Sequence, residues 1–112
     1  MDCPFCKVRK EQILSDNEKF FSIFDVSPVS KGHALVISKK HVLSFFDLDV
    51  KDGEFLLDII QKTKNILDER FRPRGFNIGV NDGKAAGQSV PHLHVHIIPR
   101  YGRERLEREY NI

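Results

Sequence analysis

The segment His92-Leu93-His94-Val95-His96-Ile97-Ile98 decides the fold prediction, because histidine alternates in it with aliphatic residues. Such alternation is typical of a β-strand, in which successive side chains point to opposite faces of the sheet. The three imidazoles are therefore expected on one face at spacings of about 6–7 Å, while Leu93, Val95 and Ile97 face the core. The whole chain contains only five histidines, so three within five residues indicate a chemical role for this face.

Three further strands are predicted from runs rich in aromatic and β-branched residues. Together with the histidine segment, the predicted strands are residues 19–26, 33–38, 76–80 and 90–98. Residues 27–32 have the composition of a turn, so the first two strands are expected to form an antiparallel pair. Pro99 is expected to end the last strand.

A single long helix is predicted between residues 49 and 71. Asp49 is expected to be its N-cap, with Asp52 and Glu54 in the first turn, where carboxylates interact favourably with the helix dipole. Apolar side chains recur at three- and four-residue intervals as far as Phe71, and Pro73 prevents the helix from continuing. We therefore assign the chain to the α+β class, as an antiparallel sheet of about five strands with one long helix packed on it.

Length and charge narrow the classes of protein to which this chain can belong. The 112 residues fit one domain over residues 1–112, and the net charge of +2 is too small to favour nucleic acid or a membrane surface. No stretch approaches the ~20 apolar residues of a membrane span, and the start of the sequence lacks the pattern of a secretion signal. We expect a cytoplasmic protein with no nucleic-acid or membrane partner. Residues 100–112 alternate arginine and glutamate and are predicted to form a solvated tail.

Cys3 and Cys6 form a Cys-Pro-Phe-Cys motif within an N-terminal segment of residues 1–10. In a reducing compartment a structural disulfide is disfavoured, which leaves metal binding or redox chemistry. A redox pair with this spacing is expected after a strand and near a βαβ unit, and no strand is predicted ahead of Cys3. Metal binding is the favoured interpretation, while a redox role and the absence of any special role stay open.

Two chemistries use a row of histidines on one strand face. Alternating imidazoles can hold a catalytic zinc ion that keeps one position for water. Alternatively, one neutral imidazole can attack phosphorus while another donates a proton or a hydrogen bond. Gly87, Gln88 and Ser89 precede the strand and can present backbone N–H groups and a hydroxyl to an anion, which modestly favours phosphate.

Residues 87–100, Gly-Gln-Ser-Val-Pro-His-Leu-His-Val-His-Ile-Ile-Pro-Arg, resemble the signature of the histidine-triad (HIT) family. That signature has three histidines separated by single apolar residues and followed by more apolar ones. Residues 24–37 resemble the family's ribose-binding strand and hairpin, and residues 76–83 resemble the segment before the triad loop. The resemblance covers nearly the whole chain and implies a HIT-like fold whose sheets are joined across a homodimer.

The resemblance also implies roles for three histidines in hydrolysis of nucleoside monophosphates linked to a leaving group. His94 matches the nucleophile, which would attack the α-phosphorus and form a nucleotidyl-histidine that water then hydrolyses. His96 matches a position that contacts the α-phosphate oxygens. His33 matches a histidine hydrogen-bonded in the same cluster, with a solvent-facing histidine at the start of a strand as the alternative.

Four further positions are implied to bind the purine nucleotide. Asp25 matches a carboxylate that accepts hydrogen bonds from the ribose hydroxyls, and Asn81 matches a polar position near the phosphate and ribose. Ser89 matches a donor to the phosphate or the leaving group, and Gln88 is expected to contribute its backbone. The base is expected against apolar residues of the first strand, which the sequence does not rank: Phe20, Phe21, Ile23 and Phe24.

The resemblance implies a structural zinc site as well. Cys3 and Cys6 would supply two thiolates, while His41 and the first triad histidine, His92, match the other two ligands. Four protein ligands close a tetrahedral site, which suits a structural and not a catalytic zinc ion. An exposed His41 with no ligand role is the alternative.

We therefore predict a HIT-family nucleotide hydrolase that acts on dinucleoside polyphosphates or nucleoside phosphoramidates. The ending Ile98-Pro99-Arg100-Tyr101 weakly favours the first substrate class. Three alternatives stay open: a nucleotide sensor without turnover, a metallohydrolase with zinc on His92, His94 and His96, and an interaction scaffold.

Overall fold

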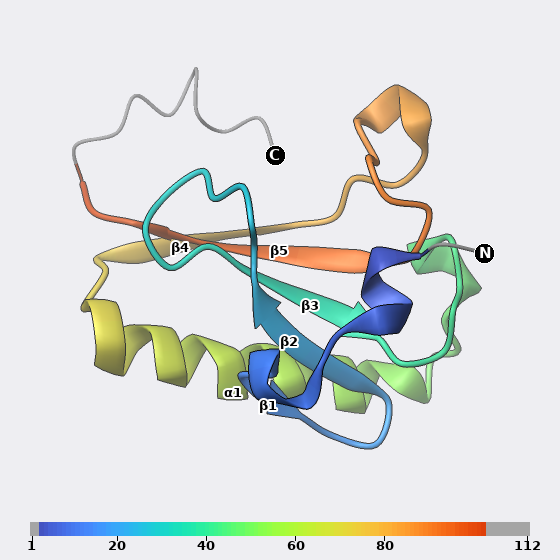
Figure 1. The fold of residues 1–112 in the computed structure, drawn as a ribbon, viewed down its shortest axis with the longest axis horizontal. Coiled ribbons are helices and arrows are strands. Elements are labelled where there is room, and N and C mark those ends of the chain that lie inside the picture. Colours follow the sequence, from blue (N-terminus) through green and yellow to red (C-terminus); the bar gives the residue numbers. More distant parts are fainter. Residues whose placement is uncertain (1–2, 103–112) are drawn as a thin grey trace.

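The computed structural model describes residues 3–102, which form a five-stranded sheet and one long helix (Figure 1). The strands are β1 (Ser15–Asp16), β2 (Phe20–Phe24), β3 (Ala34–Ser38), β4 (Gly75–Gly79) and β5 (His94–Arg100). The helix is α1 (Asp52–Phe71), and short 3₁₀ turns are η1 (Pro4–Lys7), η2 (Lys10–Gln12), η3 (Phe45–Asp47) and η4 (Lys84–Ala86). All pairings are antiparallel in the order β1-β2-β3-β5-β4, which confirms the α+β prediction.

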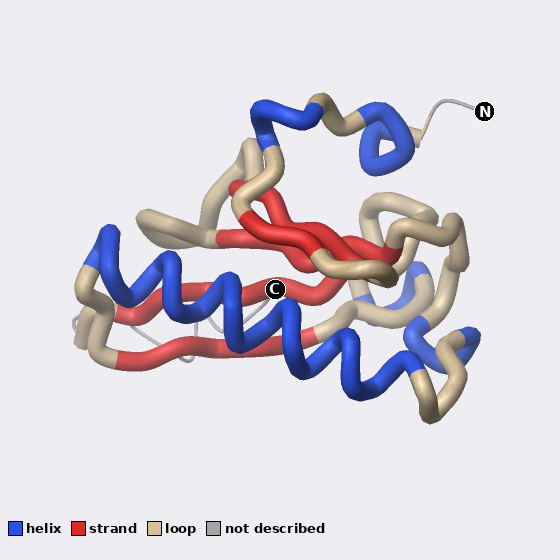
Figure 2. The backbone as a smooth tube through the Cα atoms, turned by 90° about the horizontal axis from the view of Figure 1, so that it is seen from below, coloured by secondary structure: helices blue, strands red, loops and turns tan. Residues whose placement is uncertain are grey.

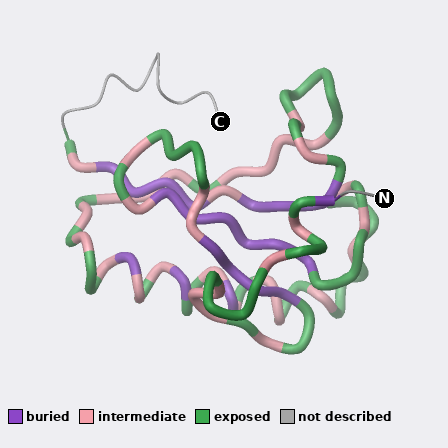
Figure 3. Tube along the Cα trace, viewed as in Figure 1, coloured by how far each residue is buried: buried purple, intermediate pink, exposed green. Residues whose placement is uncertain are grey.

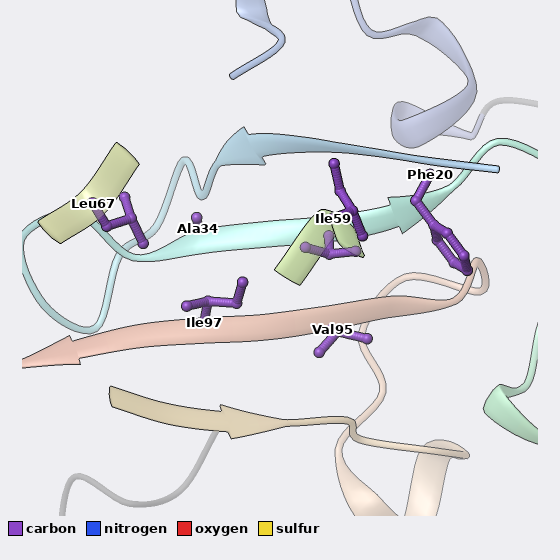
Figure 4. Packing of buried hydrophobic residues seen from close by; sticks show 7 residues of the cluster. Phe20, Ala34, Ile59, Leu67, Val95 and Ile97 are labelled. Carbon is purple, nitrogen blue, oxygen red and sulfur yellow. The ribbon is translucent and has the colours of Figure 1, made fainter. Parts of the chain in front are cut away.

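Helix α1 covers one face of the sheet, and the N-terminal segment lies over the opposite face (Figure 2). The strand side chains that point toward α1 form the main core with Ile59 and Leu67 of the helix (Figure 4). The sheet residues in this cluster are Phe20, Ala34, Val36, Val95 and Ile97. The predicted inward direction of Val95 and Ile97 is thereby confirmed, and it leaves the alternate residue His96 on the other face.

The opposite face of the sheet has a smaller apolar cluster, formed by buried Phe21, Ile23, Leu35 and Ile37. It is covered in part by Phe5, Val8 and Ile13 of the N-terminal segment. The inner strands are buried along most of their length, whereas much of the N-terminal segment and the tips of the loops are exposed (Figure 3). The sheet face opposite α1 is covered only in part, and His94 and His96 lie on it beside Ile37 and Leu35.

The start of α1 differs from the prediction. The helix begins at Asp52, with Lys51 at the N-cap position, and Asp49 lies in the turn before it. The carboxylate of Asp52 accepts a hydrogen bond of 2.9 Å from the Asp49 N–H, so the capping interaction runs backward from the first helical residue. The predicted end is confirmed, because the helix stops at Phe71 and Arg72 adopts a left-handed conformation (φ 51°).

Both ends of the histidine strand also differ from the prediction. His92 and Leu93 precede β5, since the His92 N–H bonds to the Val90 carbonyl and not to a ladder partner. Pro99 does not end the strand but pairs with Phe76 of β4. Strand β3 pairs with β5 only as far as Ile97. Pro99 lies beyond this pairing, so its missing N–H costs no hydrogen bond between β5 and β3.

The predicted tail begins later than residue 100. Arg100 is the last residue of β5 and is buried, and its Nε donates to the Asn77 side chain at 2.7 Å. The Tyr101 hydroxyl donates to the Lys31 carbonyl at 2.6 Å. The rest of the predicted tail, residues 103–112, lies outside the described residues. Within residues 3–102, no helix is both long enough and apolar enough to cross a membrane.

Candidate active site and metal centre

A pocket of about 380 Å³ opens on the sheet face opposite α1. Its titratable lining comes from His94 and His96 of β5, His33 before β3, and Asp25 after β2. Its apolar lining includes side chains from three segments: Phe5, Ile23, Phe24, Val26 and Leu35. A concave site with convergent titratable groups and apolar walls is the usual form of a small-molecule site. A larger cavity of about 470 Å³ near the start of α1 is lined mainly by Lys, Asp and Glu side chains and has no histidine or cysteine in its lining.

The tautomer of His94 is fixed by a main-chain carbonyl. Its Nδ1 lies 2.8 Å from the carbonyl oxygen of His92, an acceptor, so Nδ1 must carry the proton. The neutral ring then has its lone pair on Nε2. His94 is only 5% exposed and lines the pocket, so this lone pair belongs to a desolvated imidazole at the pocket wall. Such a nitrogen is a suitable nucleophile.

His33 and His96 form a directed chain of hydrogen bonds. The Val29 N–H donates to His33 Nδ1 at 3.0 Å, which places the proton of neutral His33 on Nε2. His33 Nε2 lies 2.9 Å from His96 Nδ1 and 3.4 Å from a carboxylate oxygen of Asp25. His96 Nδ1 therefore accepts, and its proton lies on Nε2. The chain delivers an N–H donor at His96 without any charged ring.

The electrostatics of the pocket favour neutral imidazoles. Burial, together with the neighbouring His94 and His33, lowers the pKa of His96 to about 4. Burial likewise lowers the pKa of His33, although the Asp25 carboxylate opposes this shift. At neutral pH the His33–His96 pair is therefore uncharged, consistent with the proton positions that the hydrogen bonds require.

Asp25 is held by its own turn. One carboxylate oxygen accepts the Ser27 N–H at 2.9 Å and the other faces His33. Its side chain remains 16% exposed and lines the pocket, so it can still accept hydrogen bonds from a ligand. His33 is buried and not solvent-facing, which is against the alternative raised for it from the sequence.

The loop before β5 places only one of its three predicted binding residues at the pocket. Ser89 lines the pocket and is exposed. The Gln88 side chain instead accepts the Gly83 N–H at 2.8 Å and donates to the Leu43 carbonyl at 2.9 Å, and its own N–H bonds to the Gly83 carbonyl. Asn81 lies outside the lining of the pocket in the single chain. Gln88 thus holds the loop in shape.

A second cluster joins the N-terminal segment to the end of β3 and the start of the histidine segment. The ligand atoms of Cys3, Cys6, His41 and His92 all lie within 4.8 Å of one another. Cys3 Sγ is 3.3 Å from His92 Nδ1, and Cys6 Sγ is 3.1 Å from His41 Nδ1 and 3.6 Å from His92 Nδ1. Tetrahedral zinc with its usual bond lengths would separate sulfur from nitrogen by roughly 3.6 Å. The donor set and its spacing therefore fit a closed zinc site.

The two histidines of this cluster are oriented by carbonyl groups behind them. His92 Nε2 lies 2.7 Å from the Ser38 carbonyl, and His41 Nε2 lies 3.0 Å from the Pro91 carbonyl. Each ring therefore carries its proton on Nε2 and directs the Nδ1 lone pair at the thiols, as metal-binding histidines require. Burial lowers the pKa of His92, which keeps that ring neutral and able to bind metal.

A cation would stabilise the thiolate forms of this cluster. The hydrogen bond with Cys3, followed by burial and the charge of Cys3, raises the pKa of the Cys6 thiol. Two thiolates this close repel one another, whereas a divalent cation between them would stabilise both.

A second group, formed by Asp25, His33 and His96, also has ligand atoms within 4.8 Å of one another. The hydrogen bond between the two imidazole rings already uses the nitrogens of His33 and His96 that face each other.

The alternative of a catalytic zinc on the three triad histidines does not agree with this geometry. The His92 ring faces the thiols, and His94 Nδ1 is bound to a carbonyl. Neither metal-sized group found among residues 3–102 includes His94.

The sequence did not predict a role for Phe5, which lines the pocket. Its ring packs edge to face with His94, with the ring centroids 5.0 Å apart. An aromatic residue between two metal-ligand cysteines was the available signal.

Comparison with protein families matches residues 7–103 to the HIT domain. The chain belongs to the HIT family. Protein hit from Bacillus subtilis is 37% identical over 106 residues, covering 91% of this chain and 73% of that protein. Adenosine 5'-monophosphoramidase hnt1 from Schizosaccharomyces pombe is 34% identical over 93% of this chain and 78% of its own length. Bis(5'-adenosyl)-triphosphatase from Dictyostelium discoideum is 34% identical over 93% of this chain and 71% of its own length.

Solved structures support the same HIT fold. The crystal structure of a HIT family protein from Bacillus anthracis has a TM-score of 0.81 at 38% identity, covering 91% of this chain and 75% of that one. A Zn-bound histidine triad family protein from Mycobacterium smegmatis has a TM-score of 0.82 at 32% identity, covering 95% of this chain and 80% of that one. The HIT-like fold predicted from the sequence is confirmed.

Proposed function

We propose that this HIT-family chain is a nucleotide hydrolase that cleaves the bond between an AMP group and its leaving group, with His94 as the nucleophile. The observation that carries the proposal is the 2.8 Å hydrogen bond between His94 Nδ1 and the His92 carbonyl. It assigns the lone pair of a buried imidazole to the nitrogen that is not bonded to the protein. A lone pair held in this way suits nucleophilic attack, and neither metal-sized group among residues 3–102 includes His94.

The reaction follows in two displacements. The Nε2 lone pair attacks the α-phosphorus, the bond from phosphorus to the leaving group breaks, and the leaving group departs with the bonding electrons. The resulting nucleotidyl-imidazolium keeps its Nδ1 proton, and the His92 carbonyl stabilises the positive charge through a stronger, charge-assisted hydrogen bond. Water then attacks phosphorus, AMP is released, and the neutral His94 ring is restored.

His96 and Ser89 supply hydrogen bonds to the phosphate. The His96 Nε2–H, set by the chain from Val29 through His33, is the donor for an α-phosphate oxygen as negative charge develops on it. The Ser89 hydroxyl lines the same pocket and is available to the phosphate or the leaving group. His96 is proposed to donate this hydrogen bond as a neutral ring that keeps its proton, so its protonation state need not change when the product leaves.

The nucleoside is proposed to occupy the remainder of the pocket. Asp25 accepts hydrogen bonds from the ribose hydroxyls, and Ile23, Phe24 and Leu35 offer apolar surface to a purine. Phe20 packs in the core under α1, so it is not a candidate for base contact. Asn81 keeps its predicted role near the phosphate as a proposal to be tested by substitution. The Gln88 N–H is bonded to the Gly83 carbonyl, so Gln88 is proposed to act by holding the phosphate loop in shape.

The substrate class is proposed from the named activities of relatives. One relative is named as an AMP phosphoramidase and another as a bis(5'-adenosyl)-triphosphatase, at 34% identity each. Both names describe cleavage at a phosphorus atom bonded to adenosine 5'-oxygen, so dinucleoside polyphosphates and nucleoside phosphoramidates are both proposed as substrates. The zinc ion, when bound by Cys3, Cys6, His41 and His92, would supply structural cross-linking and no chemical step.

We also propose the homodimer that the resemblance implies. Strand β4 is an outer strand of the sheet, and Ile78 on it is 54% exposed, so this edge can join a second copy. A cytoplasmic location and the absence of nucleic-acid and membrane partners stay predictions.

The proposal is tested by following AMP release from diadenosine tetraphosphate and from adenosine 5'-phosphoramidate with purified protein. We expect AMP from at least one substrate, and a loss of about four orders of magnitude or more in turnover for His94→Asn. Asn keeps a donor near the Nδ1 position and removes the nucleophile, and circular dichroism checks the fold. Nucleotide binding without turnover would favour a sensor instead, and chelation that abolishes turnover of intact protein would favour a metallohydrolase.

A further inference from the structure

The residue between the two cysteines, Phe5, belongs to the metal centre by its place in the chain and to the pocket by its contacts. Cys3, the N-cap residue of η1, and Cys6, within η1, flank Phe5, and the Cys6 N–H donates a 3.1 Å hydrogen bond to the Cys3 carbonyl. Pro4 and Phe5 of this turn line the pocket that contains His94. The turn therefore carries metal ligands at its ends and pocket wall in its middle.

The Phe5 ring is also in contact with histidines of both clusters. Its centroid lies 5.0 Å from that of His94 and 5.8 Å from that of His92, in both cases with the rings edge to face. Such aromatic pairs are attractive and directional. Phe5 also packs on the apolar cluster of β2 and β3, as Val8 does. One ring thus closes the space between the metal ligands, the sheet and the nucleophile.

The four-residue cluster links η1 to distant parts of the chain. Cys6 is exposed and Cys3 is buried, and both thiols face histidine nitrogens that come from residues 41 and 92. A short exposed turn has little core of its own, so cross-linking it through a metal ion removes much of its freedom to move away from the sheet. Without metal, the thiols and the imidazoles keep only weak hydrogen bonds.

We propose that Phe5 is a positioning residue through which metal occupancy controls nucleotide affinity. Metal bound by Cys3, Cys6, His41 and His92 fixes η1, and η1 holds the Phe5 ring as a wall of the nucleotide pocket and against His94. Loss of the metal releases this wall and weakens nucleotide binding. This inference rests on the proposed function, because it takes the pocket to be the site for AMP.

Thermodynamic linkage adds a second observable. If metal raises the affinity for AMP by some factor, AMP must raise the affinity for metal by the same factor. This quantity can be measured without any turnover, by competition of zinc between the protein and a chelator in the presence and absence of AMP.

The experiment is calorimetric titration of AMP into zinc-loaded and zinc-free full-length protein. For the wild type we expect zinc removal to weaken AMP binding about 2- to 10-fold, the range for losing one aromatic contact. In Phe5→Ala, and in Phe5→Leu if the first variant folds poorly, AMP should bind weakly and almost equally in both forms. The control Val8→Ala alters the same apolar cluster outside the pocket lining and should keep the wild-type dependence on zinc.

Three results would overturn the inference. Equal AMP affinity of zinc-loaded and zinc-free wild type would remove the coupling and leave the proposed function intact. Undiminished zinc dependence in the Phe5 variants would show that the metal acts through another residue, such as His92. Failure of the zinc-loaded wild type to bind AMP at all would contradict the proposed function together with the inference.

Discussion

The candidate metal centre (Cys3, Cys6, His41 and His92) and the proposed catalytic cluster (His33, His94 and His96) both contain histidines, but His94 faces its site with the opposite ring nitrogen to His41 and His92. In the metal centre, His41 and His92 direct Nδ1 at the thiols, while Nε2 of each faces a main-chain carbonyl. In the catalytic cluster, His94 binds a carbonyl through Nδ1 and leaves Nε2 toward the pocket. Two histidines separated by one residue thus have different tautomers and different chemistry.

This difference shows that the partner of the second nitrogen determines what a histidine can do. A carbonyl behind the ring assigns the proton, and the opposite nitrogen then carries the lone pair that meets metal or phosphorus. His92 connects the two regions, because its ring belongs to the metal centre and its carbonyl orients His94. Disrupting the metal centre should therefore affect mainly stability, and disrupting the catalytic cluster should affect mainly turnover.

The largest effect on stability is expected from removing Cys6, a proposed metal ligand. The Cys6→Ser protein is expected to be free of zinc. Its unfolding free energy should be about 4 kcal/mol lower than that of the wild type measured with free zinc at about a thousand times its Kd. Thermal and urea unfolding measure this difference, and kcat at saturating substrate should change far less. Adding a chelator should destabilise the wild type and leave Cys6→Ser unaffected. Equal stability of the two proteins with zinc present would contradict a structural metal.

A smaller effect, on turnover, is expected from the hydrogen-bond chain behind His96. His33→Asn removes the Nε2 donor, leaves His96 Nδ1 without its partner, and should lower kcat about 10- to 100-fold. His33→Gln is the matched control, because its terminal amide places a donor close to the original Nε2 and should retain more activity. Similar losses in both variants would indicate that the bulk of the ring matters and not its hydrogen bond.

A further effect is expected in the dependence of stability on pH. The pKa of His96 is about 4 in the folded chain and near 6.5 when unfolded, so between these values the unfolded chain binds more protons. The unfolding free energy should therefore fall as the pH is lowered from about 6.5 to about 4. In zinc-free protein, which avoids acid release of metal, His96→Asn should show a shallower fall than wild type. Identical slopes would contradict a depressed pKa at His96.

Much of the fold could be predicted because its elements are long and periodic. The apolar stripe that ends at Phe71 and the alternation in β5 each repeat often enough to identify helix and strand. Strand β1 has two residues and offers no such repeat. The alternation also continues through His92, where the backbone has already left the sheet, so pattern alone extended the strand too far.

The sequence predicted which histidines and cysteines lie together, but not their proton positions. The resemblance to the HIT family implies His94 as the nucleophile and Cys3, Cys6, His41 and His92 as metal ligands, and these roles stay predictions. The tautomers depend on carbonyl groups such as that of Ser38, which lies 54 residues from His92 in the chain, and the sequence carries no local signal for such a contact. The loop-bracing role of the Gln88 side chain was missed for the same reason, because its partner at Leu43 is 45 residues away.

The central claim is that His94 Nε2 becomes bonded to phosphorus during turnover. Mass spectrometry of protein quenched during turnover of diadenosine tetraphosphate tests it most directly. We predict a species heavier by one adenylyl group, with the modification on the peptide containing His94 and no such species in His94→Asn. Steady AMP formation with no adduct at any quench time, or an adduct on a different residue, would contradict it.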